Sequence, residues 1–138
     1  MIIDTSAMVA VLFDEPEMPV FARAMEDAIE CRMSAANFFE AAIVIDGWRN
    51  PVVSRRLDDL INSVGIAIEP VDETQARLAR AAYRDFGKGS GHPARLNFGD
   101  CFAYALARQR GEPLLFKGND FGHTDITPAV PPSSRRPQ

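Results

Sequence analysis

The chain has 138 residues, of which 46% are hydrophobic and 25% are charged, and its formal net charge is −4. This composition fits one globular domain that buries a core without disulfides, and it excludes a membrane-spanning protein, because no apolar run approaches the ~20 residues that such a helix needs. No basic leader precedes an apolar stretch at the start, and Cys31 and Cys101 have neither disulfide-framework nor metal-site spacing. We therefore expect a cytoplasmic protein with reduced core thiols.

The first half of the chain alternates short apolar strands with helices. Ile2-Ile3 predicts a buried strand that ends at a polar turn. Ser6, Ser34 and Asn50 can each accept hydrogen bonds from the free N–H groups of a first helical turn, so each marks a helix start. The strands expected in this half are 2–3 and 31–33, and the helices are 7–15, 16–29, 35–48 and 51–64.

The second half continues the alternation. Asp72 and Gln75 have the spacing of a capping box, and Gly111 is typical of a helix end. The strands expected here are 66–71, 114–116 and a short one near 126, and the helices are 73–86 and 98–110. Residues 128–138 are rich in Pro, Ser and Arg, so we expect a disordered tail after one domain of residues 1–127.

Short apolar strands that alternate with helices predict a parallel sheet with both faces covered. The fold class is therefore α/β, and the expected architecture is a three-layer α/β/α sandwich with a central, mainly parallel sheet.

Four acidic residues fall where such a sheet gathers its functional side chains, at the carboxyl ends of the strands. Asp4 follows the first strand, and Asp120 lies in the turn after the fourth. Asp100 lies in the first turn of a helix that leaves a glycine-rich loop. Glu40 lies in the helix after the second strand among apolar neighbours, where an unpaired carboxylate is costly.

Each acid also has a purely structural interpretation. Asp4 could cap the first helix, Asp100 is favoured at a helix N-terminus by the helix dipole, and Asp120 could shape a turn. Only their joint placement at one edge of the sheet favours a common site.

Four carboxylates at close range cannot all stay ionised unless a cation compensates them. Oxygen ligands suit Mg²⁺ or Mn²⁺, and such an ion can activate water and stabilise the leaving oxygen when a phosphodiester is cut. We expect Asp4 and Asp100 to be the principal ligands, with Glu40 and Asp120 acting through water or a second ion. The polar neighbours that could donate hydrogen bonds to these carboxylates are Thr5, Ser6, Asn97 and Asn119.

The net charge does not exclude a nucleic-acid partner. Without the four acids, the 19 acidic residues become 15, which equals the 15 basic ones. A site that binds cations would largely remove the remaining repulsion toward phosphates. The basic residues in loops that border the acidic edge, and therefore the candidates for phosphate contact, are Lys88, Arg95 and Lys117.

These motifs resemble those of PIN-domain endoribonuclease toxins of the VapC type, from bacterial type II toxin–antitoxin pairs. The similarity runs from Met1 to about Ile126. The segments that carry it are 2–7, 34–37 with Glu40, 87–89, 96–101, 103–107, 114–121 and Thr124-Asp125.

The resemblance implies metal-dependent cleavage of RNA, often tRNA or another structured RNA, and nothing in the spacing itself distinguishes RNA from DNA. It also implies a homodimer and a VapB-type antitoxin whose C-terminal segment covers the site. Asp4, Glu40 and Asp100 match the family's acids. Family members commonly carry one or two acids after the fourth strand, and because Asn119 occupies the first position, the role is assigned to Asp120, with Asp125 as the alternative.

Three other functions stay open at the level of sequence. An aspartyl-phosphate phosphatase fits Asp4 after a strand, although that chemistry needs a second Asp where Ser6 stands. A metal-free ribonuclease could use His92 and His123 as acid and base. A domain without catalysis could bind an antitoxin or RNA only.

The first two helices carry several large apolar residues, including Phe13 and Phe21. They are interpreted either as part of the core or as one wall of a groove for the antitoxin, because surplus apolar surface marks interfaces.

Overall fold

The computed structural model describes residues 1–131. It contains four strands, six α-helices and one short 3₁₀ helix within that range. The strands are β1 Ile2–Ile3, β2 Arg32–Ser34, β3 Ala67–Glu69 and β4 Leu114–Leu115. The helices are α1 Thr5–Leu12, α2 Met18–Asp27, α3 Ala35–Asp46, α4 Pro51–Val64, α5 Glu73–Phe86, α6 Phe98–Arg110 and η1 Phe121–His123.

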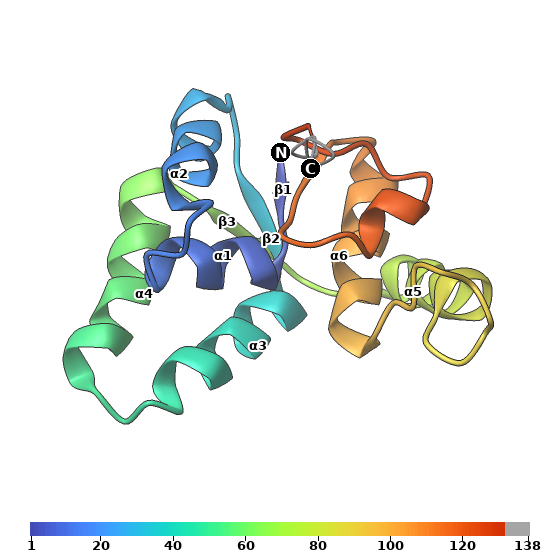
Figure 1. The fold of residues 1–138 in the computed structure, drawn as a ribbon, viewed down its shortest axis with the longest axis horizontal. Helices are drawn as coiled ribbons and strands as arrows, with labels where there is room; N and C mark the ends of the chain where they lie inside the picture. The colour runs from blue at the N-terminus through green and yellow to red at the C-terminus, as the bar shows by residue number, and fades with distance from the viewer. Residues whose placement is uncertain (132–138) are drawn as a thin grey trace, which may run out of the picture.

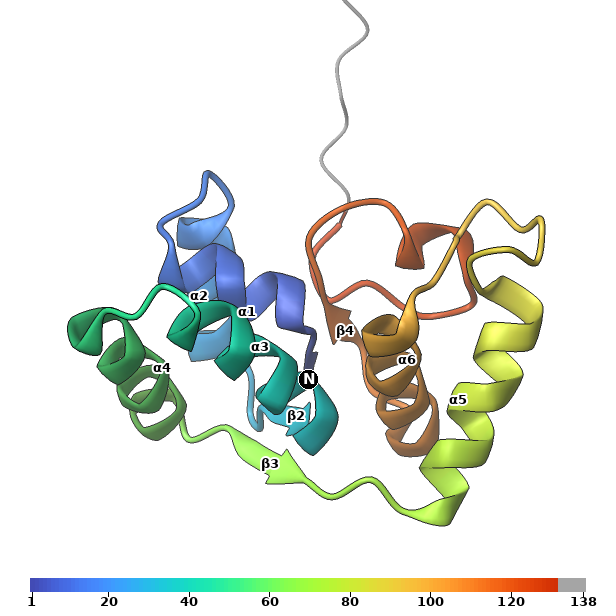
Figure 2. The same ribbon diagram turned by 90° about the horizontal axis from the view of Figure 1, so that it is seen from below.

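The four strands form one sheet in the order β3-β2-β1-β4, and every pairing in it is parallel. Helices α1 to α4 lie on one side of the sheet and α5 and α6 on the other, as both views show (Figures 1 and 2). The predicted three-layer α/β/α sandwich is therefore confirmed. The prediction of helices on both faces rested on the apolar strands, since a strand with one wet face would alternate in polarity.

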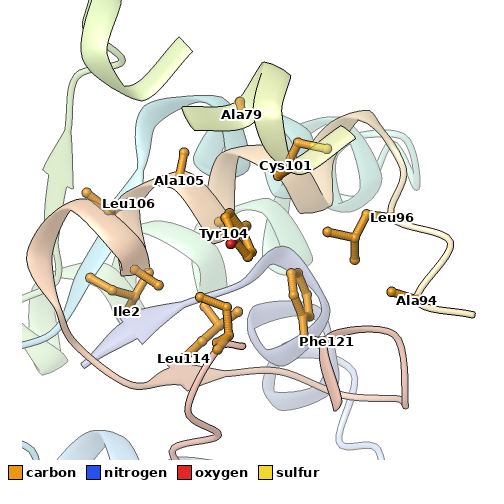
Figure 3. Close-up of a cluster of buried hydrophobic side chains, with 14 residues drawn as sticks. Ile2, Ala79, Ala94, Leu96, Cys101, Tyr104, Ala105, Leu106, Leu114 and Phe121 are labelled. Carbon is orange, nitrogen blue, oxygen red and sulfur yellow. The ribbon is translucent and has the colours of Figure 1, made fainter. Parts of the chain in front are cut away.

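The core has two halves, one on each face of the sheet. Ile2 and Leu114 point into the half under α5 and α6, and the next residue of each strand, Ile3 or Leu115, points into the half under α1 to α4. This is the two-residue alternation of side chains along a strand. Figure 3 shows Ile2 and Leu114 beside side chains of α6 in the first half.

The predicted helix ends are confirmed where they rest on local caps. The side chains of Ser34 and Asn50 accept hydrogen bonds from the first turns of α3 and α4, as expected. Gly65 and Gly111 end α4 and α6 in the left-handed conformation, with φ of 76° and 63°. A side chain is strained in that conformation, which is why glycine is favoured there.

The starts of the first two helices differ from the prediction. Asp4, not Ser6, caps α1, because its extended backbone follows directly from β1 and its side chain accepts the N–H of Ser6. Helix α2 begins at Met18 rather than Pro16, with a turn before it in which Asp14 has a φ of 51°. Gln75 completes only half of the predicted capping box, since its side chain bonds to Gln109 instead of to Asp72.

The last described segment also differs. No strand forms near Ile126 within residues 1–131; one isolated bridge joins Leu114 to Pro128 instead. The N–H of Ala129 donates to the Leu114 carbonyl at 2.8 Å, and Ala129 and Val130 pack on the α1–α4 half of the core. The packed part of the chain thus extends past residue 127. The rest of the expected tail, 132–138, lies outside the described residues.

Both cysteines are buried free thiols, as predicted. Among residues 1–131, no helix combines the length and the apolar character that crossing a membrane requires.

Candidate active site

The four acids belong to the edge of the sheet formed by the carboxyl ends of the strands, near the point where the strand order changes direction. The chain proceeds outward from β1 through β2 to β3 and then returns to place β4 on the other side of β1. Ligands of open parallel sheets bind at this switch point, outside the carboxyl ends of the strands. Asp4 leaves β1 there, and the turn from Lys117 to Asp120 leaves β4 beside it.

Asp4 is the most buried of the four acids, with only 2% of its surface exposed. Its Oδ2 accepts the N–H of Ser6 at 3.0 Å and the Ser6 hydroxyl at 2.5 Å. Its Oδ1 is buried and has no hydrogen-bond partner within the described part of the chain. Burial, with smaller contributions from the charges of Asp100 and Glu40, raises the pKa of Asp4 to about 7 despite the two hydrogen bonds.

Asp100 combines a helix cap with a second role. Its N–H donates to Asn97 Oδ1 at 2.9 Å, and its Oδ2 accepts the N–H of Asn97 at 3.0 Å, a reciprocal capping box. Burial raises the pKa of Asp100 to about 6, with smaller contributions from the charges of Asp120 and Glu40. The hydrogen bond from Asn97 lowers this pKa, so burial and, to a smaller extent, the neighbouring acids outweigh the cap.

Glu40 reaches the same place from α3. Its carboxylate lies against the first turn of α6, so closely that a side-chain carbon at position 99 would overlap it. Glycine at this position is what lets the Glu40 carboxylate approach Asp100.

Asp120 and Asp125, the two candidates for the fourth acid, lie in different surroundings. Asp120 is exposed in the turn before η1, and its charge raises the pKa of Asp100, so it faces the site. Asp125 is engaged elsewhere: Tyr104 donates its hydroxyl to Oδ1 at 2.7 Å, and Arg108 lies 3.4 Å from Oδ2. The structure therefore brings together Asp4, Glu40, Asp100 and Asp120 and leaves the alternative acid outside.

Of the four polar neighbours predicted to donate hydrogen bonds to the acids, two do so and two do not. Ser6 and Asn97 bond directly to Asp4 and Asp100. Thr5 does not; its hydroxyl donates to the Asn37 carbonyl. The side chain of Asn119 makes no hydrogen bond to an acid among the described residues and lines a neighbouring hollow instead.

Two residues near the acids were not predicted from the sequence, Asn37 and Gly99. Asn37 is fully buried, and its Nδ2 donates to the Gly99 carbonyl at 2.9 Å. A fully buried amide three residues before Glu40 is a signal only once its burial is known, because asparagine is usually exposed.

The three basic residues predicted to contact phosphates differ in whether they already form ion pairs. Lys88 and Arg95 are exposed and form no ion pair within residues 1–131. Lys117 is bound to Glu15 and to Glu17, the latter at 3.2 Å. Its contact with phosphate stays a prediction, although two carboxylates of the α1–α2 turn already pair with its ammonium group.

The two histidines make different contacts within the described residues. His92 packs edge-on against Phe86 with ring centroids 4.9 Å apart, and its Nδ1 accepts the N–H of Ala94. His123 lies in η1 and lines the hollow beside α2.

Among residues 1–131, no three His, Cys, Asp or Glu side chains already form a cage that could hold a metal ion. A preformed cage is not required for Mg²⁺, because this ion keeps several waters and needs only one or two carboxylates. The unpartnered, buried Oδ1 of Asp4 is a free oxygen ligand of the right kind. The residues present thus suit a hydrated divalent ion held mainly by two carboxylates.

Comparison with known proteins identifies the family to which this fold belongs. The family model for the PIN domain matches residues 1–126. Ribonuclease VapC28 of Mycobacterium tuberculosis is 58% identical over 130 residues, which are 94% of this chain and 98% of that relative. Ribonuclease VapC42 of the same species is 52% identical over 129 residues, which are again 94% of this chain and 98% of the relative. A crystal structure of M. tuberculosis VapC20, described as a sarcin–ricin loop cleaving toxin, has the same fold, with a TM-score of 0.73 at 16% identity over 95% of this chain and 98% of that one. The chain belongs to the PIN-domain family and, within it, to the VapC group.

Proposed function

We propose that this chain is the toxin of a type II toxin–antitoxin pair, a Mg²⁺-dependent endoribonuclease that hydrolyses RNA phosphodiesters. The observation that carries the proposal is the buried Oδ1 of Asp4, which has no hydrogen-bond partner within residues 1–131 although the charges of Asp100 and Glu40 are close enough to raise the pKa of Asp4. A buried acceptor without a partner is costly, and a divalent cation would satisfy it and compensate the like charges. The names of the VapC relatives supply ribonuclease activity as the chemistry.

In this proposal, Asp4 and Asp100 hold the ion, and Glu40 and Asp120 bind its water or a second ion. Mn²⁺ would serve in place of Mg²⁺, since both prefer oxygen ligands. The bound ion would supply Lewis-acid stabilisation of the charge that develops on the phosphodiester. Ser6 orients Asp4, and Asn97 orients Asp100 through the capping box. The cytoplasmic location stays a prediction.

The substrate is proposed to be tRNA or another structured RNA. Lys88 and Arg95 are the phosphate contacts, because both are exposed and free of carboxylate partners in the described part of the chain. Both belong to the loop between α5 and α6, which leads directly into Asn97 and Asp100.

A VapB-type antitoxin is the proposed inhibitor. A hollow of about 900 Å³ lies between α2 and the segment after β4, and it borders the site at Asn119. Val20 lines it with 52% of its surface exposed. Leu12 and Met25 are buried in the core, and Phe21 lines the hollow with only 5% of its surface exposed, so the hollow offers fewer exposed apolar residues than the apolar pattern of these helices suggested.

A homodimer is also proposed. Phe39 and Ile43 of α3 and Phe98 of α6 are 65%, 58% and 79% exposed, on the two helices that meet at Glu40 and Gly99. Large apolar side chains gathered on neighbouring helices are typical of a protein interface.

The proposal is tested with purified chain and total RNA. We expect cleavage with Mg²⁺ or Mn²⁺ and none in EDTA, and we expect Asp100→Asn to lose most activity while it stays folded. Asp85→Asn, an exposed acid of α5, is the control and should cleave normally. Full activity in chelator would contradict the metal site, and binding of RNA or antitoxin without cleavage under any metal would favour the non-catalytic alternative. Sequencing RNA ends after expression in cells identifies the substrate.

A further inference from the structure

A chain of buried polar contacts runs beneath the acids and joins three helices. The Thr5 hydroxyl of α1 donates to the Asn37 carbonyl of α3 at 3.2 Å. The Asn37 amide in turn donates to the Gly99 carbonyl of α6 at 2.9 Å. Thr5 is 8% exposed and Asn37 is fully buried. We call this chain of contacts the polar bridge.

Each member of the polar bridge lies within three residues of an acid in the sequence. Thr5 follows Asp4, Gly99 precedes Asp100, and Asn37 stands three residues, or about one helical turn, before Glu40. The three helices that supply the acids are thus tied together at the points where those acids emerge.

Asn37 is an unfavourable choice if its role were packing alone. Its Oδ1 is buried without a partner in the described residues, so the side chain carries the cost of an unsatisfied acceptor. An apolar side chain of similar shape would avoid that cost. A residue kept at such a position provides something that packing does not, and here that is the bond to Gly99.

The bond lies beside the contact between Glu40 and the first turn of α6. The Glu40 carboxylate fills the space that a side chain at position 99 would need. A small shift of Gly99 relative to α3 would therefore change the separation between Glu40 and Asp100.

We propose that Asn37 is a positioning residue, which fixes the separation of the Glu40 and Asp100 carboxylates by holding the Gly99 carbonyl. The inference rests on the proposed metal site and adds to it the element that sets its dimensions. It predicts that the polar bridge contributes to metal affinity and not to the stability of the fold.

The test is Mn²⁺ binding to the metal-free chain, measured by calorimetry and by the electron paramagnetic resonance signal of free Mn²⁺. Asn37→Leu keeps the volume but removes the donor, and we expect it to weaken Mn²⁺ binding by about tenfold or more, the usual effect of losing a residue that orients metal ligands. Its free energy of unfolding should be unchanged or higher. Ile45→Val, another fully buried position of α3, is the control and should lose stability without losing Mn²⁺ affinity.

Gly99→Ala is the second variant, and it is informative even if Asn37→Leu fails to fold. Alanine stabilises a helix relative to glycine, but here it displaces the Glu40 carboxylate. We expect Mn²⁺ affinity to fall while helix stability rises.

The outcomes separate the two levels of the proposal. Parent chain that binds no Mn²⁺ would overturn the metal site and this inference together. If the parent chain binds Mn²⁺ and Asn37→Leu binds it equally well, the role of Asn37 is overturned and the metal site stays intact. If Gly99→Ala binds Mn²⁺ equally well, the separation of Glu40 and Asp100 does not set the affinity, and the premise of the inference is overturned.

Discussion

The hydroxyl of Ser6 donates to Asp4 Oδ2 at 2.5 Å while it accepts the backbone N–H of Lys117 at 2.9 Å, so it joins the most buried acid to the turn after β4. Because the hydrogen bond from the Ser6 hydroxyl lowers the pKa of Asp4, its loss raises that pKa further, while the bond from the backbone N–H of residue 6 remains. We expect Ser6→Ala to reduce cleavage near pH 7 by about 10–100-fold, and the deficit to shrink toward pH 9.

The measurement is the pH profile of cleavage at subsaturating Mg²⁺, where protons and the metal ion compete for Asp4. Ser6→Thr keeps the hydroxyl and is the control. A deficit of equal size at every pH would mean that Ser6 acts through packing and not through the pKa of Asp4.

The stability of the metal-free chain should depend on pH in a particular direction. The pKa values of Asp4 and Asp100 are raised from 3.8 to about 7 and about 6 in the folded state, so the folded state binds more protons than the unfolded one between these values. Their contribution to stability is fully present below about pH 4 and is lost as the pH rises to about 7.

Asp4→Asn should therefore stabilise the chain in EDTA near pH 7.5, on the order of 2 kcal/mol, while Asn still caps α1. Denaturant unfolding in EDTA at several pH values measures this. A parent chain whose stability rises from pH 4 to 7 would contradict the raised pKa values.

Asp125 should matter for stability and not for cleavage. Asp125→Ala leaves the Tyr104 hydroxyl and Arg108 without their acceptor, at a cost of about 1 kcal/mol. Asp120→Ala should do the opposite and lower cleavage without loss of stability, since it removes a like charge near Asp100. Thermal unfolding and cleavage assays compare the two variants. A folded Asp125→Ala chain without activity would make Asp125 the fourth acid.

The contacts to RNA should come from the loop before α6. Lys88→Ala or Arg95→Ala should lower the slope of log affinity against log salt by about 0.7–0.9 each, the contribution of one phosphate contact. Lys117→Ala should change it little, because Glu15 and Glu17 already neutralise that charge. Binding is measured with Asp100→Asn protein, which should not cut the RNA. Equal slopes for all three variants would place the RNA elsewhere.

Antitoxin binding should be sensitive to a charge placed on the wall of the hollow beside α2. Val20→Asp changes an exposed side chain, so the chain should fold normally while antitoxin affinity drops by about 1–3 kcal/mol. Phe21→Asp would instead unfold the chain, because Phe21 is 5% exposed within the core. Arg23→Asp, on the exposed surface of the same helix, is the control. Unchanged binding by Val20→Asp would place the antitoxin outside the hollow.

The sequence by itself determined the elements and the set of acids. Helix ends at Ser34, Asn50 and Gly111 follow from hydrogen bonds and backbone conformations within a few residues, so they can be read locally. The acids could be placed at one edge because parallel strands bring their carboxyl ends together whatever their order. The capping of α1 was misassigned, since Asp4 and Ser6 are both good caps and only the end of β1 decides between them.

Only the tertiary structure decided which side chains meet across the chain. Asn37 and Gly99 are 62 residues apart, and Lys117 and Glu15 are 102 residues apart, so no local pattern links them. The same holds for Asp125, which Tyr104 and Arg108 draw away from the site, and for Phe21, whose burial depends on how α2 packs. Caps and periodicity act over one helical turn, whereas these contacts depend on how the helices pack against the sheet, and that packing is set by the whole core.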